Sequence, residues 1–237
     1  LVVEKLTQMG KAYSPRPILY EVSDLLSSDL RKFTGGREYE PIESNPLLGY
    51  RGGLRMLHDR EVFHVELKAI QRTREEGNLN NIHLLLPFIR SADEFLRIKK
   101  MIIDFRLTRQ SGCKLWLSID TPAAIVTLEH YLKAGVDGIS LNADNLTMLF
   151  SGLDPHNSEV AVQFREDNEA VLEAYHYAIK LCHKYNIPII FSGETLIHRG
   201  ELLEKLVSWG ISGITVEPHG LENIRKTIYK YERRLLK

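Results

Sequence analysis

Arg51 stands among glycines, and this setting suits the binding of a small anion. Gly49 lies two positions before it, and Gly52 and Gly53 follow it directly. Glycine has no side chain, so the backbone of such a segment can come close to a ligand. The planar guanidinium can donate two parallel hydrogen bonds to a carboxylate or a phosphate. The segment therefore predicts an anion site at Arg51, and the alternative is an arginine that ties loops together.

Other polar residues at the ends of apolar runs could complete such a site. They are Arg90, Asp120, Asp144, Asn145 and Ser192. In α/β barrels the carboxyl ends of the strands collect the active residues. Two cations and two carboxylates at one mouth would suit a metal-bound 2-oxo acid or its enol phosphate, because Mg²⁺ takes oxygen ligands from one or two carboxylates. The alternative is structural, with Arg90 closing a strand end and the aspartates serving turns.

The elements that would position these residues alternate along the chain. Short apolar runs rich in β-branched residues predict buried strands at residues 17–20, 82–88, 115–120, 138–141, 187–192 and 213–216, and a shorter strand is expected near Tyr50. Apolar residues at helical spacing predict helices at residues 91–103, 123–132 and 168–183. Ser91 followed by Glu94 is a capping box, and Gly135 and Gly210 are helix stops.

A local near-repeat indicates how the strands run. Residues 131–140 and 206–215 share a helix end, a glycine turn, a second glycine and a strand. A repeated αβ unit of this kind implies parallel strands covered by helices. The pattern alone fits a (β/α)8 barrel or a doubly wound open sheet.

Composition excludes several classes of protein. The chain has 237 residues, which fits one α/β barrel domain. Lys plus Arg and Asp plus Glu both total 31, so no net field favours nucleic acid or an anionic membrane. No apolar run approaches the ~20 residues that a membrane helix needs. Cys113 and Cys182 have neither disulfide nor metal spacing, which is typical of a reducing cytoplasm.

Six segments in order carry a family resemblance. They read R-P-I-L-Y and S-D within 16–24, N-P-L-L-G-Y-R-G at 45–52, L-P-F-I-R at 86–90, S-L-N-A-D-N-L-T at 140–147, G-L-D at 152–154 and F-S-G-E at 191–194. They resemble motifs of phosphoenolpyruvate synthase, pyruvate phosphate dikinase and the phosphotransferase-system enzyme I. The resemblance covers nearly the whole chain and favours the (β/α)8 TIM barrel over the open sheet.

This resemblance implies a domain plan and a function. Residues 1–14 would be a linker or lead-in helix, and residues 15–237 a single phosphoenolpyruvate/pyruvate-binding barrel. The start at Leu1 suggests a fragment of a longer protein. The family domain catalyses Mg²⁺-dependent phosphoryl transfer between a phosphohistidine and pyruvate. The expected partners are therefore pyruvate or phosphoenolpyruvate, the phosphohistidine and ATP-binding domains of the full-length protein, and a second copy in a homodimer.

The resemblance also assigns substrate and metal positions. Arg51 matches a clamp arginine for the phosphate, and Arg90 matches the arginine after P-F-V. The metal-binding Glu of the family matches Ile119 without a gap, or Asp120 if one residue is deleted. The segment with Asn142, Ala143, Asp144 and Asn145 matches a substrate-binding stretch whose Asp also binds the metal.

Three departures fall at chemically demanding positions. Glu21 stands where the family has its other clamp arginine, Asn145 stands at the metal-binding Asp, and Ser192 replaces the acid/base Cys. Asp144 is one residue away from the metal position. A thiol with a pKa near ~8.5 exchanges a proton far more easily than an alkyl hydroxyl does.

These departures keep two other functions open. One is a barrel without catalytic activity, used for regulation or for binding another small acid. The other is a metal-dependent pyruvate lyase that uses Arg51 with Asp120 or Asp144. Nothing in the sequence indicates a nucleic-acid module.

Overall fold

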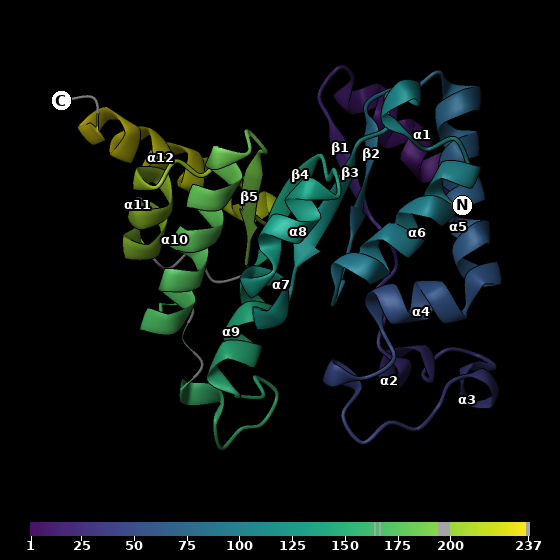
Figure 1. Ribbon diagram of the computed structural model, residues 1–237, viewed down its shortest axis with the longest axis horizontal. Coiled ribbons are helices and arrows are strands. Elements are labelled where there is room, and N and C mark those ends of the chain that lie inside the picture. The colour runs from purple at the N-terminus through teal and green to yellow at the C-terminus, as the bar shows by residue number, and fades with distance from the viewer. Residues whose placement is uncertain (164, 166, 194–199, 236–237) are drawn as a thin grey trace. The chain divides into compact units, whose positions relative to one another are not determined.

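The computed structural model is an α/β protein in which strands alternate with helices along the chain (Figure 1). It describes residues 1–163, 165, 167–193 and 200–235. These residues divide into two compact units, residues 1–117 and 118–237. The strands are β1 (Ile18–Glu21), β2 (Ile82–Leu86), β3 (Leu115–Ile119), β4 (Gly138–Asn142), β5 (Ile189–Ser192) and β6 (Gly213–Thr215).

The helices fill the intervals between the strands. In the first unit they are α1 (Val2–Tyr13), α2 (Ser27–Leu30), α3 (Gly36–Tyr39), α4 (Gly52–His58), α5 (Arg60–Gly77) and α6 (Ala92–Asp104). In the second unit they are α7 (Pro122–Val126), α8 (Leu128–Lys133), α9 (Ala143–Ser151), α10 (Glu169–Lys184), α11 (Gly200–Ser208) and α12 (Leu221–Leu235).

The first unit is built on parallel pairing of β1 with β2 and of β2 with β3. All five residues of β2 are buried, as expected of a parallel strand covered on both faces. The amphipathic helix α5 turns Phe63, Leu67 and Ile70 inward, and all three are buried. In Figure 1, α5 and α6 lie along one side of these strands, and α2 and α3 lie beyond the strand ends, next to α4.

The second unit repeats this plan with β4, β5 and β6, which also pair in parallel. The buried face of α10 carries Val171, Tyr175 and Ile179. The Tyr175 ring meets the Phe191 ring of β5 edge to face, with centroids 5.1 Å apart. Helix and strand are thus fixed by aliphatic and aromatic packing, and the strand ends remain available for polar residues.

Most of the expected elements are confirmed. All six strands inferred from apolar runs are present, and α6 begins at the predicted cap, where the Ser91 side chain accepts a hydrogen bond from the Glu94 amide. Gly135 and Gly210 have φ angles of +81° and +82°, which explains why glycine follows the helices there.

Two local predictions were wrong. The expected helix at residues 123–132 is divided into α7 and α8, because Thr127 has φ −102° and ψ 17°. In place of the short strand expected near Tyr50, the chain has a 3₁₀ turn at Pro46–Leu48, and α4 begins three residues after it, at Gly52. The described residues therefore form six strands, and the closed eight-stranded barrel stays a prediction.

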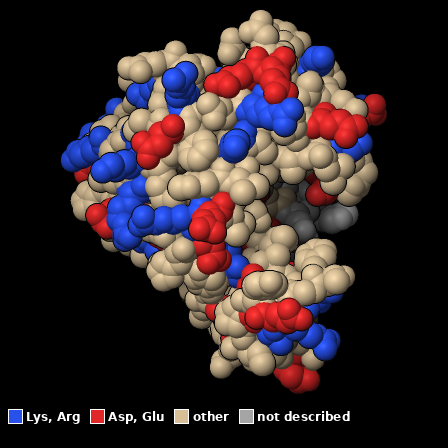
Figure 2. Space-filling view, turned by 90° about the vertical axis from the view of Figure 1, so that its right-hand side faces the viewer, with Lys and Arg blue, Asp and Glu red and all other residues tan. Residues whose placement is uncertain are grey.

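The surface carries charges of both signs. On the face drawn in Figure 2, Lys and Arg side chains alternate with Asp and Glu in small groups, in keeping with 31 residues of each sign. Among the described residues, no helix is long and apolar enough to cross a membrane.

Candidate functional site

Arg51 occupies the N-cap position of α4, and an aspartate of its own chain holds its guanidinium. The Nε and Nη2 atoms donate to the two carboxylate oxygens of Asp24, at 3.2 and 2.5 Å. The Nη1 atom donates to the carbonyl oxygen of Leu47 at 3.3 Å. Arg51 is only 8% exposed. The side chain is therefore fixed in place, and a ligand anion would have to share it with Asp24.

Arg90 lies beside Arg51 in the first unit. Its Nη1 atom donates to the carbonyl oxygen of Arg51 at 3.2 Å, and its Nη2 atom donates to that of Gly49 at 3.0 Å. Both guanidinium groups contact the ring of Phe88, with Cζ atoms 4.2 and 4.6 Å from the ring centroid. Such cation–π contacts favour a fixed arrangement. The structure thus brings the two predicted arginines together, and it places Arg90 as a support of the Arg51 loop.

The glycines after Arg51 serve close packing. Gly52 has a φ of +57°, and a Cβ atom there would lie 2.5 Å from the Cβ atom of Phe88. A Cβ atom on Gly53 would lie 2.5 Å from Oε1 of Glu94. Position 52 therefore needs glycine, because its φ is positive and the new atom would meet a Cβ atom and backbone. At Gly53 a side chain would require the Glu94 carboxylate to shift. The space expected to admit a ligand beside these two glycines is filled by the protein itself.

Glu94 and Asp24 contact the arginines, although the sequence analysis placed neither of them in the site. The Oε2 atom of Glu94 accepts a hydrogen bond from the backbone amide of Arg90 at 2.6 Å, and Glu94 is buried. Asp24 belongs to the S-D pair of the first family motif, and this motif was the sequence feature that could have identified it as a site residue. For Glu94 the only signal was the capping box, which assigned its carboxylate to Ser91.

A second acid lies near β1 in the same unit. Glu66 of α5 accepts hydrogen bonds from the Tyr20 hydroxyl at 2.7 Å and from the Ser23 amide at 3.1 Å. Burial raises the pKa of Glu66, and the two hydrogen bonds oppose this effect. Burial also raises the pKa of Tyr20, and the hydrogen bond to Glu66 adds to it. The pair therefore keeps the phenol protonated.

Two of the predicted metal residues of the second unit, Asp120 and Asn145, contact each other. Asp120 directly follows β3 and is 1% exposed. The Nδ2 atom of Asn145 donates to its Oδ1 atom at 2.7 Å. Ile119 is also buried, as the last residue of the strand. Asp120 therefore contacts Asn145, and which of Asp120 and Ile119 stands at the other metal position of the family stays a prediction.

The turn from β4 into α9 positions the remaining candidates. The Oδ1 atom of Asn142 caps α9 by accepting a hydrogen bond from the Asn145 amide at 3.1 Å. Ala143 is buried in the first turn, and Asp144 is half-buried beside it. Ser192 pairs in register with Asn142, so the ends of β4 and β5 lie side by side. Glu194 of the F-S-G-E motif lies outside the described residues.

The oxygen donors at these strand ends suit a hard cation. Asp120 and Asp144 supply carboxylates and Asn145 an amide, and Mg²⁺ takes one or two carboxylates with water and substrate completing its shell. Within the described part of the chain, no group of three or more His, Cys, Asp or Glu residues could hold a metal by itself. The donor set thus fits an ion that relies on its substrate and water for the remaining ligands.

Sequence comparison shows what this chain resembles. The model of the family described as "PEP-utilising enzyme, PEP-binding domain" matches residues 2–233. The probable phosphoenolpyruvate synthase of Methanocaldococcus jannaschii is 33% identical over 99% of this chain, and the phosphoenolpyruvate synthase of Aeropyrum pernix is 30% identical over 99%. The chain spans only 20% and 29% of the length of these two relatives.

A solved structure supports the fold. The crystal structure of RipC from Yersinia pestis superposes with a TM-score of 0.52 over 95% of this chain and 81% of that chain. The two sequences are 14% identical, so this likeness concerns the fold alone.

Proposed function

This chain belongs to the PEP-utilising enzymes as a PEP-binding domain, and we propose that it binds phosphoenolpyruvate or pyruvate in a phosphoenolpyruvate synthase-like phosphotransferase. The observation that carries the proposal is the fixed Arg51 loop, in which a bidentate ion pair and an aromatic ring hold a guanidinium in one orientation. A pre-positioned arginine loses little entropy when it binds a carboxylate or phosphate.

The residues of the second unit would hold Mg²⁺. Asp120 and Asp144 would supply carboxylate ligands, and the side-chain oxygen of Asn145 would supply a neutral one. Bound Mg²⁺ would polarise the oxygens of the substrate and neutralise their charge. Asn142 and Ala143, at the start of α9, would contact the substrate through the polar turn that they form.

Ser192 would contact the methylene carbon of the substrate at the end of β5. A serine hydroxyl holds its proton much more firmly than a cysteine thiol does, so the proton transfer that forms phosphoenolpyruvate would be slow without a neighbouring base. Because Glu21 stands at the position of the other clamp arginine of the family, the phosphate would be held by Arg51 alone. Arg90 would support the loop that carries Arg51. We expect binding to be better preserved than turnover.

The surroundings of the domain follow from the same assignment. The domain would adopt the eight-stranded barrel and receive its phosphoryl group from a phosphohistidine domain, which an ATP-binding domain charges. It would assemble as a homodimer and work in the cytoplasm, where the free cysteines Cys113 and Cys182 would stay reduced. The whole reaction needs these partners, whereas ligand binding by the domain does not.

Calorimetric titration with oxalate, an enolpyruvate mimic, tests the binding. We expect heat that depends on Mg²⁺. Arg51→Lys keeps a charge beside Asp24 but loses the planar fork, and should weaken binding about tenfold. Arg72→Ala is the matched control, because Arg72 lies on the surface of α5 with its side chain 63% exposed. A folded protein that gives no heat at millimolar oxalate with Mg²⁺ would refute the proposal.

A second candidate is a binding domain without catalytic activity. The observation that favours it is the hydrogen bond from Asn145 to Asp120, which satisfies a carboxylate with an amide of the chain itself. Exchange of the methyl protons of pyruvate, followed by NMR, separates the two candidates. The variant Glu21→Arg/Asn145→Asp/Ser192→Cys should exchange, and the native chain should not. Rapid exchange by the native chain would exclude this candidate.

A further inference from the structure

Arg74 of α5 is a buried arginine that lacks a counterion. It is 6% exposed. Its Nη1 atom donates to the carbonyl oxygen of Ile82, and its Nη2 atom donates to that of Ser111 at 2.7 Å. No Asp or Glu in the described part of the chain forms an ion pair with it. A buried charge without a partner of opposite charge costs free energy, so an anion beside Arg74 would be stabilising.

Other arginines of the first unit that are withdrawn from water have the carboxylate that Arg74 lacks. The buried Arg51 donates to both carboxylate oxygens of Asp24. The half-buried Arg55 donates through both Nη atoms to the carboxylate of Glu40, at 2.9 and 2.8 Å. Arg74 departs from these two, because its described partners are neutral carbonyl groups.

A hollow of about 250 Å³ opens beside Arg74. It is lined by the end of α5, the loop into β2 and the segment that follows α6. Its polar lining residues include Glu75, Asn78, Asn80 and Arg106. The bonds of Arg74 join α5 to the start of β2 and to the turn before β3, so these walls are fixed before any ligand arrives. The volume is below the ~300–1,000 Å³ of drug-sized sites and suits a small ion.

Arg74 keeps a donor for a ligand in this hollow. Its two bonds leave other N–H groups of the guanidinium unused. Its Nε atom makes no hydrogen bond with any described residue, and it is not one of the fully buried side-chain atoms that lack a partner. The Nε atom therefore has accessible surface, and an oxygen of a ligand can reach it.

Arg106 brings a second guanidinium to the hollow. Its carbonyl oxygen accepts a hydrogen bond from the Ser111 hydroxyl at 2.6 Å, which fixes its backbone. Its side chain is exposed and, over the described ranges, forms no ion pair and no hydrogen bond. Glu75, which accepts a hydrogen bond from the Gln71 amide at 3.0 Å, adds a carboxylate to the lining. Two arginines and one carboxylate leave one net positive charge, so the lining favours an anion with a single charge.

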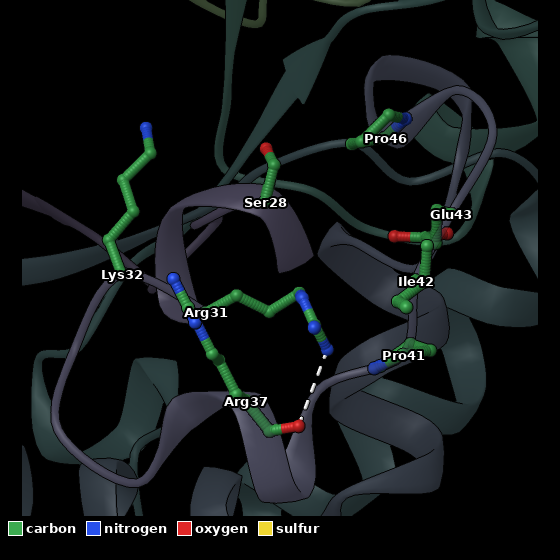
Figure 3. Close-up of a pocket in the computed structure, with 8 residues that line it drawn as sticks. All are labelled: Ser28, Arg31, Lys32, Arg37, Pro41, Ile42, Glu43 and Pro46. Atoms are coloured by element: carbon green, nitrogen blue, oxygen red, sulfur yellow. Dashed lines mark hydrogen bonds between the residues drawn. The ribbon is translucent and has the colours of Figure 1, made fainter.

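The hollow between α2 and α3 offers a contrast (Figure 3). Its cations are Arg31, Lys32 and Arg37, and none of them is buried. Arg31 donates to the carbonyl oxygens of Arg37 and Glu40, at 3.4 and 2.6 Å. Exposed cations are solvated already and gain little from pairing with an anion. The buried charge of Arg74 distinguishes the smaller hollow from this one.

We propose that the hollow beside Arg74 binds a small carboxylate with a single charge. The carboxylate accepts hydrogen bonds from Arg74 and Arg106. An arginine with a structural role alone would explain the bonds to Ile82 and Ser111, but not the unpaired second guanidinium beside a buried charge. The hollow lies at the amino end of β2, whereas Arg90 follows the carboxyl end. The site is therefore separate from the Arg51 loop, and it does not depend on the proposed reaction.

Titration at low salt tests this site, followed by the amide signals of Ser111 and Gly112 in ¹H–¹⁵N NMR spectra. Acetate is the probe, acetamide has the same shape without the charge, and inorganic phosphate at pH 8 carries a second charge. We expect saturable shifts with acetate and none with acetamide. Phosphate should bind at least about fivefold more weakly than acetate, because the lining neutralises only one charge. Arg51→Lys should leave the response to acetate unchanged.

Substitution of the second arginine locates the ligand. Arg106→Ala should weaken acetate binding about tenfold, because a charge-assisted hydrogen bond is lost. Arg72→Ala is the matched control, since Arg72 lies on α5 outside the hollow with its side chain 63% exposed. It should leave acetate binding unchanged. Circular dichroism of each variant establishes that it is folded, as expected for two exposed positions.

Asn80→Asp tests the missing counterion directly. A Cβ atom on Gly112 would lie 3.8 Å from Nη2 of Arg74 and 3.9 Å from the Cβ atom of Asn80, so Asn80 stands near the guanidinium. An aspartate there would supply the carboxylate that the chain lacks. The variant should lose acetate binding and unfold at a higher temperature than the native chain.

Several results would each overturn the proposal. They are the absence of saturable shifts with acetate, an equal response to acetamide, and binding of phosphate as tight as that of acetate. Equal effects of Arg106→Ala and Arg72→Ala would also overturn it, as would an Asn80→Asp variant that binds acetate like the native chain.

Discussion

The two units present different chemistry at their strand ends. In the first unit, Arg51 and Arg90 are held by a carboxylate, by backbone carbonyls and by one aromatic ring. In the second, the Asn145 amide donates a hydrogen bond to the Asp120 carboxylate at 2.7 Å. The cationic end is held by ionic, backbone and aromatic contacts, whereas the carboxylate end includes a hydrogen bond from a neutral amide.

This difference indicates which chemistry the chain retains. A guanidinium fixed by several partners can lose one of them and keep its position. The protonation of an aspartate that accepts a hydrogen bond from a neutral amide changes when a charged group replaces that amide. We therefore expect Gly52→Ala and Asp24→Ala to act mainly on stability, and Asn145→Asp to change metal binding as well as stability.

The largest effect is expected from Gly52→Ala. The new Cβ atom would meet Phe88 at 2.5 Å, and alanine is strained at a φ of +57°. Overpacking and backbone strain together should lower the free energy of unfolding by about 4 kcal/mol. Gly35→Ala is the control, since its φ is +79° with no atom within 4 Å, and it should cost about 1 kcal/mol. Urea unfolding measures both, and equal losses would contradict the packing argument.

Asp24→Ala should come next. It leaves the buried Arg51 guanidinium without its carboxylate, and breaking such a pair from one side costs about 3 kcal/mol. Asp29→Ala removes a surface pair with Lys32 and should cost under about 1 kcal/mol. Thermal unfolding compares the two. If Asp24→Ala is as stable as the control, the ion pair contributes little to the loop.

Asn145→Asp tests the hydrogen bond between Asn145 and Asp120 in the second unit. It places a second carboxylate against Asp120 and should lower stability at pH 7 by about 2 kcal/mol. Repulsion raises the pKa of the pair, so this loss should diminish as the pH falls and the pair takes up a proton. Millimolar Mg²⁺ should restore stability in the variant more than in the native chain. A thermal shift without any Mg²⁺ effect would argue against a cation site.

The smallest effect concerns Glu66. Burial raises its folded-state pKa above the usual value of 4.5, so the folded chain holds this proton more tightly than the unfolded chain does. Its contribution to stability is therefore fully present below pH 4.5 and declines as the pH rises through the raised value. Glu66→Gln should flatten this part of the pH–stability curve, by about 1 kcal/mol or less. An unchanged curve from pH 4 to pH 7 would contradict it.

The strands were predictable because each is a short, continuous apolar run with clear ends. The 3₁₀ turn before Arg51 was not, because residues 45–50 have no hydrophobic period and Tyr50 alone indicated a strand. The split at Thr127 was also missed, since the apolar spacing of residues 123–132 continues through it.

The positions of the site residues at strand ends could be predicted from the sequence. The residues that they contact could not. Asp24 lies 27 residues from Arg51, and Asp120 lies 25 residues from Asn145. Nothing local in the sequence specifies contacts across such separations, because they follow from how the strands pair. The sequence therefore indicated where charge would gather, and the fold determined which group neutralises which.

The Phe88 ring has a consequence for how mutations would combine. One ring supports two guanidinium groups, and its backbone adopts a φ of +48°, which is unusual for a bulky residue. A change at either arginine alters what the ring offers to the other. The stability lost on substituting Arg51 and Arg90 singly would therefore not add up to the loss in the double variant. The difference would measure the coupling energy between the two arginines through the Phe88 ring.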